Sequence, residues 1–183
     1  INIIREALVR EGAPADIIQG IEEPSIALTQ ELMKRCQLTI ATGGRPMVKS
    51  AYSTGVPAYG SGAGNATVII DNTCDTPERQ AEAAENTRIS KTSDFGSGCS
   101  CDGNLIICED IYDDFVKALE AQGAYLANEE EAEKLKNVMW DETGHRLPNT
   151  VAISPQKLAE AAGFTLPEDR KFIAVTGGGI EGV

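Results

Sequence analysis

Cys99 is the residue whose type and surroundings are best suited to chemistry, because it lies in a stretch of small residues, Gly96-Ser97-Gly98-Cys99-Ser100. Apolar patterns predict a helix over residues 78–90 and a strand over residues 104–108, so the thiol is expected on a tight turn between them. The preceding glycines remove bulk and permit unusual backbone angles, which lets a ligand approach the sulfur closely. These features favour a nucleophilic thiol.

Two other uses of the thiols are open at Cys99 and Cys101. A metal site usually needs further ligands at suitable spacing, and the only histidine, His145, lies far along the chain in a polar turn, so we expect no metal. A disulfide between residues two apart is geometrically awkward, and no signal peptide points to an oxidising compartment. The turn favours a reactive thiol over both.

The composition limits the partners. The chain has 183 residues, of which 42% are hydrophobic, and a formal net charge of −12. This charge disfavours nucleic acid and anionic membranes, because both are polyanions, and no apolar run approaches the ~18–20 residues of a membrane helix. Five cysteines without a secretory leader fit a reducing cytoplasm, and Cys36 and Cys108 are expected in the core because they lie in apolar patterns.

A second stretch, Thr42-Gly43-Gly44-Arg45-Pro46, joins a strand predicted over residues 38–41 to a helix predicted over residues 46–53. A strand that ends in such a turn presents free backbone N–H groups and the positive end of a helix dipole, which favour phosphate. Pro46 suits the first helical turn, where its missing donor costs nothing, and Arg45 adds a charge. The turn is a candidate phosphate site, and an ordinary strand-to-helix turn is the alternative.

The loop over residues 61–65 is a third candidate, because it is richer in glycine than packing requires. One interpretation is a glycine-lined passage beside a ligand. The other is a plain connection to the strand predicted over residues 66–71.

Around these stretches, predicted helices and strands alternate along the chain. Such alternation indicates an α/β fold in which helices flank parallel sheets. Besides the elements above, the patterns predict a helix that ends at Gly12, strands over residues 17–21, 124–127, 150–153 and 172–175, and helices over residues 26–36, 111–122, 128–138 and 155–162.

Several motifs occur in a suggestive order: Ile21-Glu22-Glu23-Pro24-Ser25, Ala41-Thr42-Gly43-Gly44, Met47-Val48-Lys49, Ala58-Tyr59-Gly60-Ser61-Gly62-Ala63-Gly64-Asn65, Ser90-Lys91-Thr92 and the Cys99 turn. In this order they resemble the CoA-acylating branch of the aldehyde dehydrogenase superfamily. The resemblance covers nearly the whole chain and implies a partial chain of that α/β fold. Residues 1–60 would be the C-terminal part of the dinucleotide-binding domain, and residues 61–183 the first part of the catalytic domain.

The resemblance also implies roles for single residues. Beside the expected nucleophile the sequence departs from the usual family pattern, with Ser93-Asp94-Phe95 before the turn and Cys101-Asp102 after it. The implied nucleophile is Cys99, and the implied cofactor-binding residues are Thr42, Gly43 and Gly44 at the pyrophosphate, Arg45 beside them, and Gly62, Gly64 and Asn65 along the passage to the thiol.

The implied reaction requires a thiolate, and because an ordinary thiol has a pKa of about 8.5, nearby donors or a helix N-terminus must favour it. Cys99 would attack an aldehyde to form a thiohemiacetal, pass hydride to NAD or NADP, and retain the acyl group as a thioester. Hydrolytic relatives carry a water-activating glutamate at a position matching about Gly60 or Ser61, whereas residues 57–65 contain no carboxylate. The thiol of CoA is therefore expected to take the acyl group.

The expected partners are a short-chain aldehyde and CoA, in a cytoplasmic homo-oligomer. The segments around Lys91 and Trp140 resemble acylating enzymes of sulfoacetaldehyde metabolism, and a sulfonate would need a cation such as Arg88, Lys91 or Arg146. Two alternatives from other classes are a hydrolytic NAD(P)-dependent aldehyde dehydrogenase and a non-catalytic nucleotide-binding or assembly module.

Overall fold

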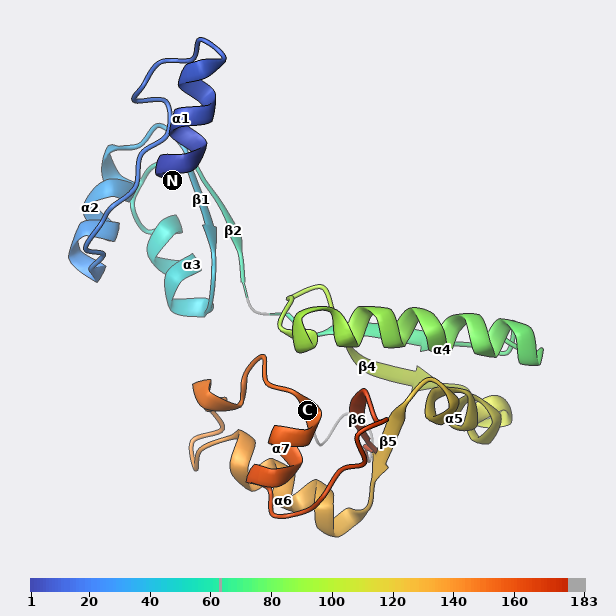
Figure 1. Cartoon of the computed structure of the whole chain (residues 1–183). Helices are drawn as coiled ribbons and strands as arrows, with labels where there is room; N and C mark the ends of the chain where they lie inside the picture. Colours follow the sequence, from blue (N-terminus) through green and yellow to red (C-terminus); the bar gives the residue numbers. More distant parts are fainter. Residues whose placement is uncertain (63, 178–183) are drawn as a thin grey trace. The chain divides into compact units, whose positions relative to one another are not determined.

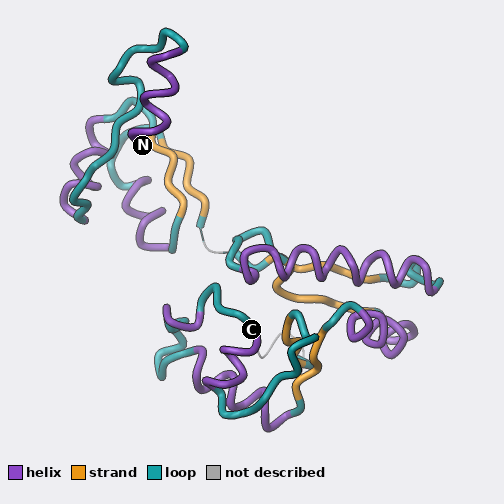
Figure 2. Tube along the Cα trace, viewed as in Figure 1, coloured by secondary structure: helices purple, strands orange, loops and turns teal. Residues whose placement is uncertain are grey.

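The computed structural model describes residues 1–62 and 64–177, in which helices alternate with strands along the chain (Figures 1 and 2). The chain divides into two compact units, Ile1–Ala63 and Gly64–Val183. In the described part of both units the strands form three two-stranded sheets, each of them parallel. The predicted α/β class with parallel sheets and flanking helices is confirmed.

The first unit is built on one parallel strand pair. β1 (Thr39–Thr42) pairs with β2 (Ala58–Ser61), α1 (Asn2–Arg10) and α2 (Ile26–Arg35) precede them, and α3 (Arg45–Tyr52) connects them (Figure 1). A small core of Met33, Ala41 and Ala51 joins α2, β1 and α3. The turn between β1 and α3 is therefore held by packing on its helix side.

The strand predicted over residues 17–21 is wrong, because this segment is irregular, with a bend at Ile17 and Ile18. The Arg5 side chain of α1 donates from Nε and Nη2 to the Ile18 carbonyl, at 3.2 and 3.0 Å. Ile17 is 59% exposed, so its apolar side chain does not anchor the segment in the core. A short apolar run needs a partner strand to remain extended, and here an arginine side chain binds the backbone instead.

The second unit begins with a parallel strand pair that carries two helices on one face. β3 (Ala66–Ile70) pairs with β4 (Asp102–Ile107), and α4 (Pro77–Thr92), the long helix in Figure 1, connects them. This face packs against α4 and α5 (Tyr112–Ala121) through a core that includes Ile70, Ala84 and Phe115. Because the two strands are parallel, the residues just before β3 and those just before β4 lie at the same end of the sheet.

The rest of the second unit forms a further parallel pair. β5 (Ala124–Ala127) pairs with β6 (Phe172–Val175), both at their predicted positions, and α6 (Glu129–Met139) and α7 (Pro155–Ala161) lie between them in the chain. The strand predicted over residues 150–153 is wrong. Thr150 ends a single 3₁₀ turn, Pro148–Thr150, and its carbonyl accepts a hydrogen bond from Arg146 Nη2 at 2.8 Å. As at Ile18, an arginine side chain binds the backbone carbonyl that would otherwise pair with a neighbouring strand.

Candidate active site

Cys99 lies at a corner of an exposed turn. The Cys101 N–H donates to the Gly98 carbonyl at 3.0 Å, which closes a four-residue β-turn over residues 98–101 with Cys99 in its second position. Cys99 is exposed, whereas Cys36, Cys74, Cys101 and Cys108 are half-buried. The expected tight turn is thus present, and the thiol at its corner is open to a ligand. Its role as nucleophile stays a prediction.

The segment before the turn has an unusual backbone. Asp94, Phe95 and Gly96 are all left-handed, with φ of 49°, 50° and 70°. Each such residue other than glycine costs about 1–2 kcal/mol, so the surrounding structure must hold them. Part of that support is local, because Ser97 donates from Oγ to the Asp94 carboxylate at 2.8 Å and from its N–H to the Asp94 carbonyl at 3.1 Å.

The segment after the turn is held by α4. Ser90 Oγ donates to Asp102 Oδ1 at 2.9 Å and accepts the Asp102 N–H at 3.0 Å. Both partners of this interaction are half-buried. Ser90 therefore fixes the first residue of β4, three residues after Cys99. Cys99 thus lies between the C-terminal end of α4 and the start of β4.

The β3–β4 pairing brings one predicted passage residue to this turn. Ala66 pairs with Asp102 and Thr67 with Asn104, so Gly103 is the extra residue of a bulge. Asn65, directly before β3, lies against Gly103. Gly62 falls in the first unit and Gly64 in the second, a Cβ at either would meet no atom within 4 Å, and Ala63 between them lies outside the described residues. The glycines of this loop are not required by packing in the described chain.

The predicted phosphate turn joins β1 to α3. Gly44 is the N-cap of α3 and no side chain caps this helix, while Pro46 occupies its first turn. Thr42, Gly44 and Arg45 are exposed, and Gly43 anchors the turn by donating its N–H to the Ser61 carbonyl at 3.1 Å. An uncapped helix N-terminus with an exposed arginine suits a phosphate group.

Gly60 of β2 has a packing role that the sequence did not reveal. A Cβ at this position would lie 2.5 Å from Val48 Cγ1 and 2.9 Å from Tyr52 Cε2, both on α3. The Gly60 N–H also donates to Tyr52 Oη at 2.9 Å. A carboxylate side chain at residue 60 therefore has no room under α3, whereas Ser61 is exposed.

The three cations proposed for a sulfonate differ in their surroundings. Arg88 donates to Gln122 and Glu85. Arg146 lies over the Trp140 ring with its Cζ 4.9 Å from the centroid and donates to Thr150, and burial lowers its pKa. The side chain of Lys91 passes over Gly96, where a Cβ would lie 3.5 Å from its Cδ and Cε. Only Lys91, among these three, reaches the segment that carries Cys99.

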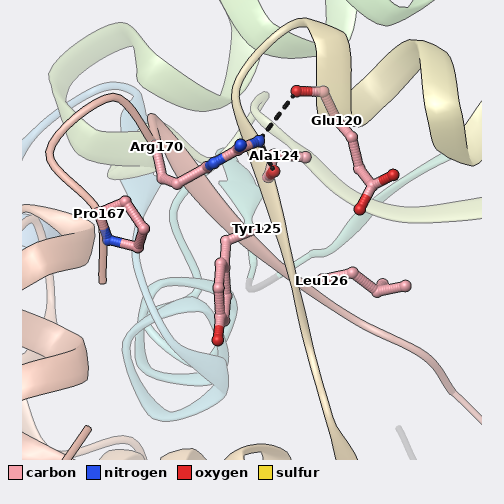
Figure 3. A pocket seen from close by; sticks show the side chains of 6 residues that line it. All are labelled: Glu120, Ala124, Tyr125, Leu126, Pro167 and Arg170. Atoms are coloured by element: carbon pink, nitrogen blue, oxygen red, sulfur yellow. Dashed lines mark hydrogen bonds between the residues drawn. The ribbon is translucent and has the colours of Figure 1, made fainter. Parts of the chain in front are cut away.

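A hollow of about 380 Å³ lies elsewhere in the second unit, along β5 (Figure 3). One of the polar side chains that line it, Arg170, donates from Nη1 to the carbonyls of Glu120 and Ala124, both at 3.1 Å, so this guanidinium holds the chain together. None of the predicted site residues lines this hollow. In residues 1–62 and 64–177 we find no group of three metal-ligating side chains, and no helix there is both long and apolar enough to cross a bilayer.

The chain is similar to known proteins over nearly its whole length. It is 42% identical over 181 residues to a sulfoacetaldehyde dehydrogenase from Acholeplasma sp., with 97% of this chain and 36% of the relative covered. It is 40% identical to an acylating sulfoacetaldehyde dehydrogenase from Bilophila wadsworthia, and this match covers 97% of the chain and 38% of the relative. The chain thus spans less than two fifths of these relatives. No family model matches the sequence.

Solved structures show the same likeness. An acetylating aldehyde dehydrogenase from Geobacillus thermoglucosidasius superposes with a TM-score of 0.88 at 38% identity, with 95% of this chain and 38% of that chain covered. A propionaldehyde dehydrogenase from Rhodopseudomonas palustris, with bound CoA and an acylated cysteine, gives a TM-score of 0.82 at 27% identity and covers 94% and 39%. Over the part of these proteins that it spans, the chain therefore matches the CoA-acylating branch of the aldehyde dehydrogenase superfamily in sequence and in fold.

Proposed function

We propose that the protein of which this chain forms part converts a short-chain aldehyde, CoA and NAD or NADP⁺ to acyl-CoA and the reduced cofactor. The observation that carries the proposal is the exposed thiol of Cys99 on its β-turn, with Asn65 against the start of the following strand. The relative with an acylated cysteine supports a covalent route. The proposed active site is centred on this thiol.

In the proposed reaction the Cys99 thiolate adds to the aldehyde carbon and forms the oxyanion of a thiohemiacetal. Loss of hydride from that carbon converts it to a thioester, and NAD or NADP, when bound, supplies the hydride acceptor. The turn of Thr42, Gly43, Gly44 and Arg45 would hold the cofactor pyrophosphate, because it offers an uncapped helix N-terminus and a cation. Attack by the thiol of CoA then releases acyl-CoA and restores the Cys99 thiol.

Release to CoA rather than to water is supported by residues 57–65. This stretch contains no carboxylate, and the position of Gly60 is closed by Val48 and Tyr52. Without a base to activate water, the thioester persists until CoA reaches it. A hydrolytic aldehyde dehydrogenase is the competing function.

The substrate that we propose is an aldehyde with an anionic group, and sulfoacetaldehyde is the first candidate. Two curated relatives act on it by name, and Lys91 places a cationic side chain beside the segment that leads to Cys99. The test is Lys91→Gln in the full-length protein. We expect the KM for sulfoacetaldehyde to rise about 10-fold, as for loss of one charge-assisted contact, with the KM for acetaldehyde unchanged. Equal effects on both aldehydes would contradict the role of Lys91.

The function itself is tested with the full-length protein, an aldehyde and NAD⁺ or NADP⁺, in the presence and absence of CoA. We expect steady formation of reduced cofactor only with CoA, and acyl-CoA as the product by mass spectrometry. Without CoA, one equivalent of reduced cofactor per active site should form as Cys99 becomes acylated. Steady production of the free acid without CoA would overturn the acylating function in favour of the hydrolytic one.

Several further expectations stay predictions. We propose that residues 1–60 belong to the dinucleotide-binding domain and residues 61–183 to the catalytic domain, and the division of the chain into compact units at residues 63 and 64 supports this. A cytoplasmic location and a homo-oligomeric state are likewise proposed. The net charge of −12 supports the expectation that neither nucleic acid nor a membrane is a partner.

A further inference from the structure

Asn65 and Gly103 fit each other in a way that only glycine permits. The Asn65 side chain occupies the space where a Cβ at residue 103 would be, so that such a Cβ would overlap its amide oxygen and lie 3.1 Å from its Nδ2. Nearly every other residue type would therefore displace either Asn65 or the strand. Gly103 has no left-handed backbone angle, so the close approach of the Asn65 amide is what requires glycine here.

This contact lies at an irregular point of the sheet. Gly103 is the unpaired residue of the bulge between β3 and β4, and a bulge re-aims the chain around it. Its neighbour Asp102 is bonded on the other side by Ser90 of α4. The start of β4 is therefore held between Ser90 and Asn65. The β-turn that carries Cys99 directly precedes this fixed point in the chain.

We propose that Asn65 is a positioning residue for Cys99, acting through Gly103, and that it is not a cofactor-binding residue as the family resemblance implies. The activity readout of this inference depends on the proposed function, whereas the placement of the Asn65 side chain does not. Reacting atoms must lie within a few tenths of an ångström of their productive geometry, and a shift of about 1 Å in a nucleophile can cost about 100-fold in rate.

The test is a size exchange in the full-length protein. Gly103→Ala adds a methyl group where Asn65 lies, and we expect kcat to fall about 100-fold with the KM for the cofactor nearly unchanged. Asn65→Ala removes the support and should lower kcat by less, about 5- to 10-fold. In the double variant Asn65→Ala/Gly103→Ala the new methyl group enters the vacated space, so kcat should return to the value of Asn65→Ala alone.

Two measurements keep the outcome independent of the aldehyde reaction. The rate at which iodoacetamide alkylates Cys99, followed by mass spectrometry, should change in Gly103→Ala and return toward that of Asn65→Ala in the double variant. Thermal unfolding should show that all variants fold, with Asn137→Ala on the exposed side of α6 as the matched control. If the unmodified protein forms no acyl-CoA, the proposed function fails and the alkylation rates alone decide the role of Asn65.

Two results would overturn the inference. One is a double variant no better than Gly103→Ala in kcat and in alkylation, which would show that the methyl group does not act through Asn65. The other is a higher KM for NAD or CoA in Asn65→Ala at unchanged kcat and unchanged alkylation rate, which would assign Asn65 to cofactor binding.

Discussion

Two of the glycine-rich segments of this chain, the turn before α3 and the segment before Cys99, are similar in composition and different in conformation. In the turn before α3, Gly44 has φ of −67°, and a Cβ there would meet only Pro46 Cδ, at 3.6 Å. In the segment before Cys99, Gly96 has φ of 70°, and a Cβ there would lie 3.0 Å from the Lys91 carbonyl oxygen. At Gly44 the first turn is thus open and unstrained, whereas Gly96 allows a strained backbone in the second.

This difference agrees with the two proposed tasks. A phosphate-binding turn needs exposed N–H groups, which a regular strand-to-helix turn already provides. A nucleophile must be presented in one orientation, and here the orientation is maintained by Ser90, Asn65 and the turn bonds, against an unfavourable backbone at Asp94 and Phe95. We infer that the two turns respond differently to substitution, which can be measured.

The largest difference concerns the chemistry itself. Cys99→Ala should lower acyl-CoA formation by more than about 10³-fold, because the covalent route loses its nucleophile. Binding of NAD⁺ or NADP⁺, measured by fluorescence or calorimetry, should be nearly unchanged, since the turn at residues 42–45 is intact. Cys36→Ala is the matched control, because the half-buried Cys36 caps α2 in the other unit. Retained activity in Cys99→Ala would contradict the assignment.

Thiol alkylation sharpens the same comparison. Burial is the largest influence on Cys74 and raises its pKa, although the nearby Arg79 opposes this effect, whereas Cys99 is exposed. At neutral pH iodoacetamide should therefore label Cys99 well before Cys74, as peptide mapping would show. Labelling of Cys74 should increase as the pH is raised, because more thiolate forms there. Preferential labelling of Cys74 at pH 7 would contradict the exposed position of Cys99.

The backbone difference predicts unequal costs for the same substitution. Gly96→Ala should lower the free energy of unfolding by about 1–2 kcal/mol, because alanine is disfavoured at this φ and its methyl group approaches the Lys91 carbonyl. Gly44→Ala should cost less, about 0.5 kcal/mol, because a φ of −67° suits alanine and only the preference for glycine at the N-cap is lost. Urea titration of both variants measures the difference. Equal values would show that the left-handed segment is not held in the folded protein.

Much of the fold could be predicted from local patterns. β5 and β6 lie at their predicted residues, because their apolar patterns depend on neighbouring residues alone. The errors at residues 17–21 and 150–153 arose where Arg5 and Arg146 bind backbone carbonyls, which periodicity does not reveal. The exposed turn at Cys99 was expected from its small residues.

The support of the turn could not be predicted. The contact of Asn65 with Gly103 depends on the register of two strands and on a bulge, and no sequence pattern specifies either one. A left-handed Phe95 even opposes its local preference. What the sequence indicates at this site is the residue proposed as nucleophile, whereas the residues that hold its turn follow only from tertiary structure.

The bonds from Ser90 to Asp102 predict a smaller effect that is confined to the Cys99 turn. Ser90→Ala removes both hydrogen bonds to the first residue of β4, and we expect a loss of about 1–2 kcal/mol in unfolding free energy. The alkylation rate of Cys99 should change with it, whereas the KM for the cofactor should not. Ser50→Ala, on the helix of the other turn, is the matched control. An unchanged alkylation rate would show that Asp102 does not control the position of Cys99.

The smallest effect belongs to the first turn. Tyr52→Phe removes only the hydroxyl that accepts the Gly60 N–H, and the ring remains packed against Gly60, so unfolding should become easier by about 0.5–1.5 kcal/mol. The more informative measurement is the reaction product, because Gly60 and the exposed Ser61 are the positions that match the water-activating glutamate of hydrolytic relatives. The proportion of free acid to acyl-CoA should stay the same in Tyr52→Phe, since a looser Gly60 still provides no base. A rise in free acid would contradict the proposal that the lack of a carboxylate in residues 57–65 is what protects the thioester from hydrolysis.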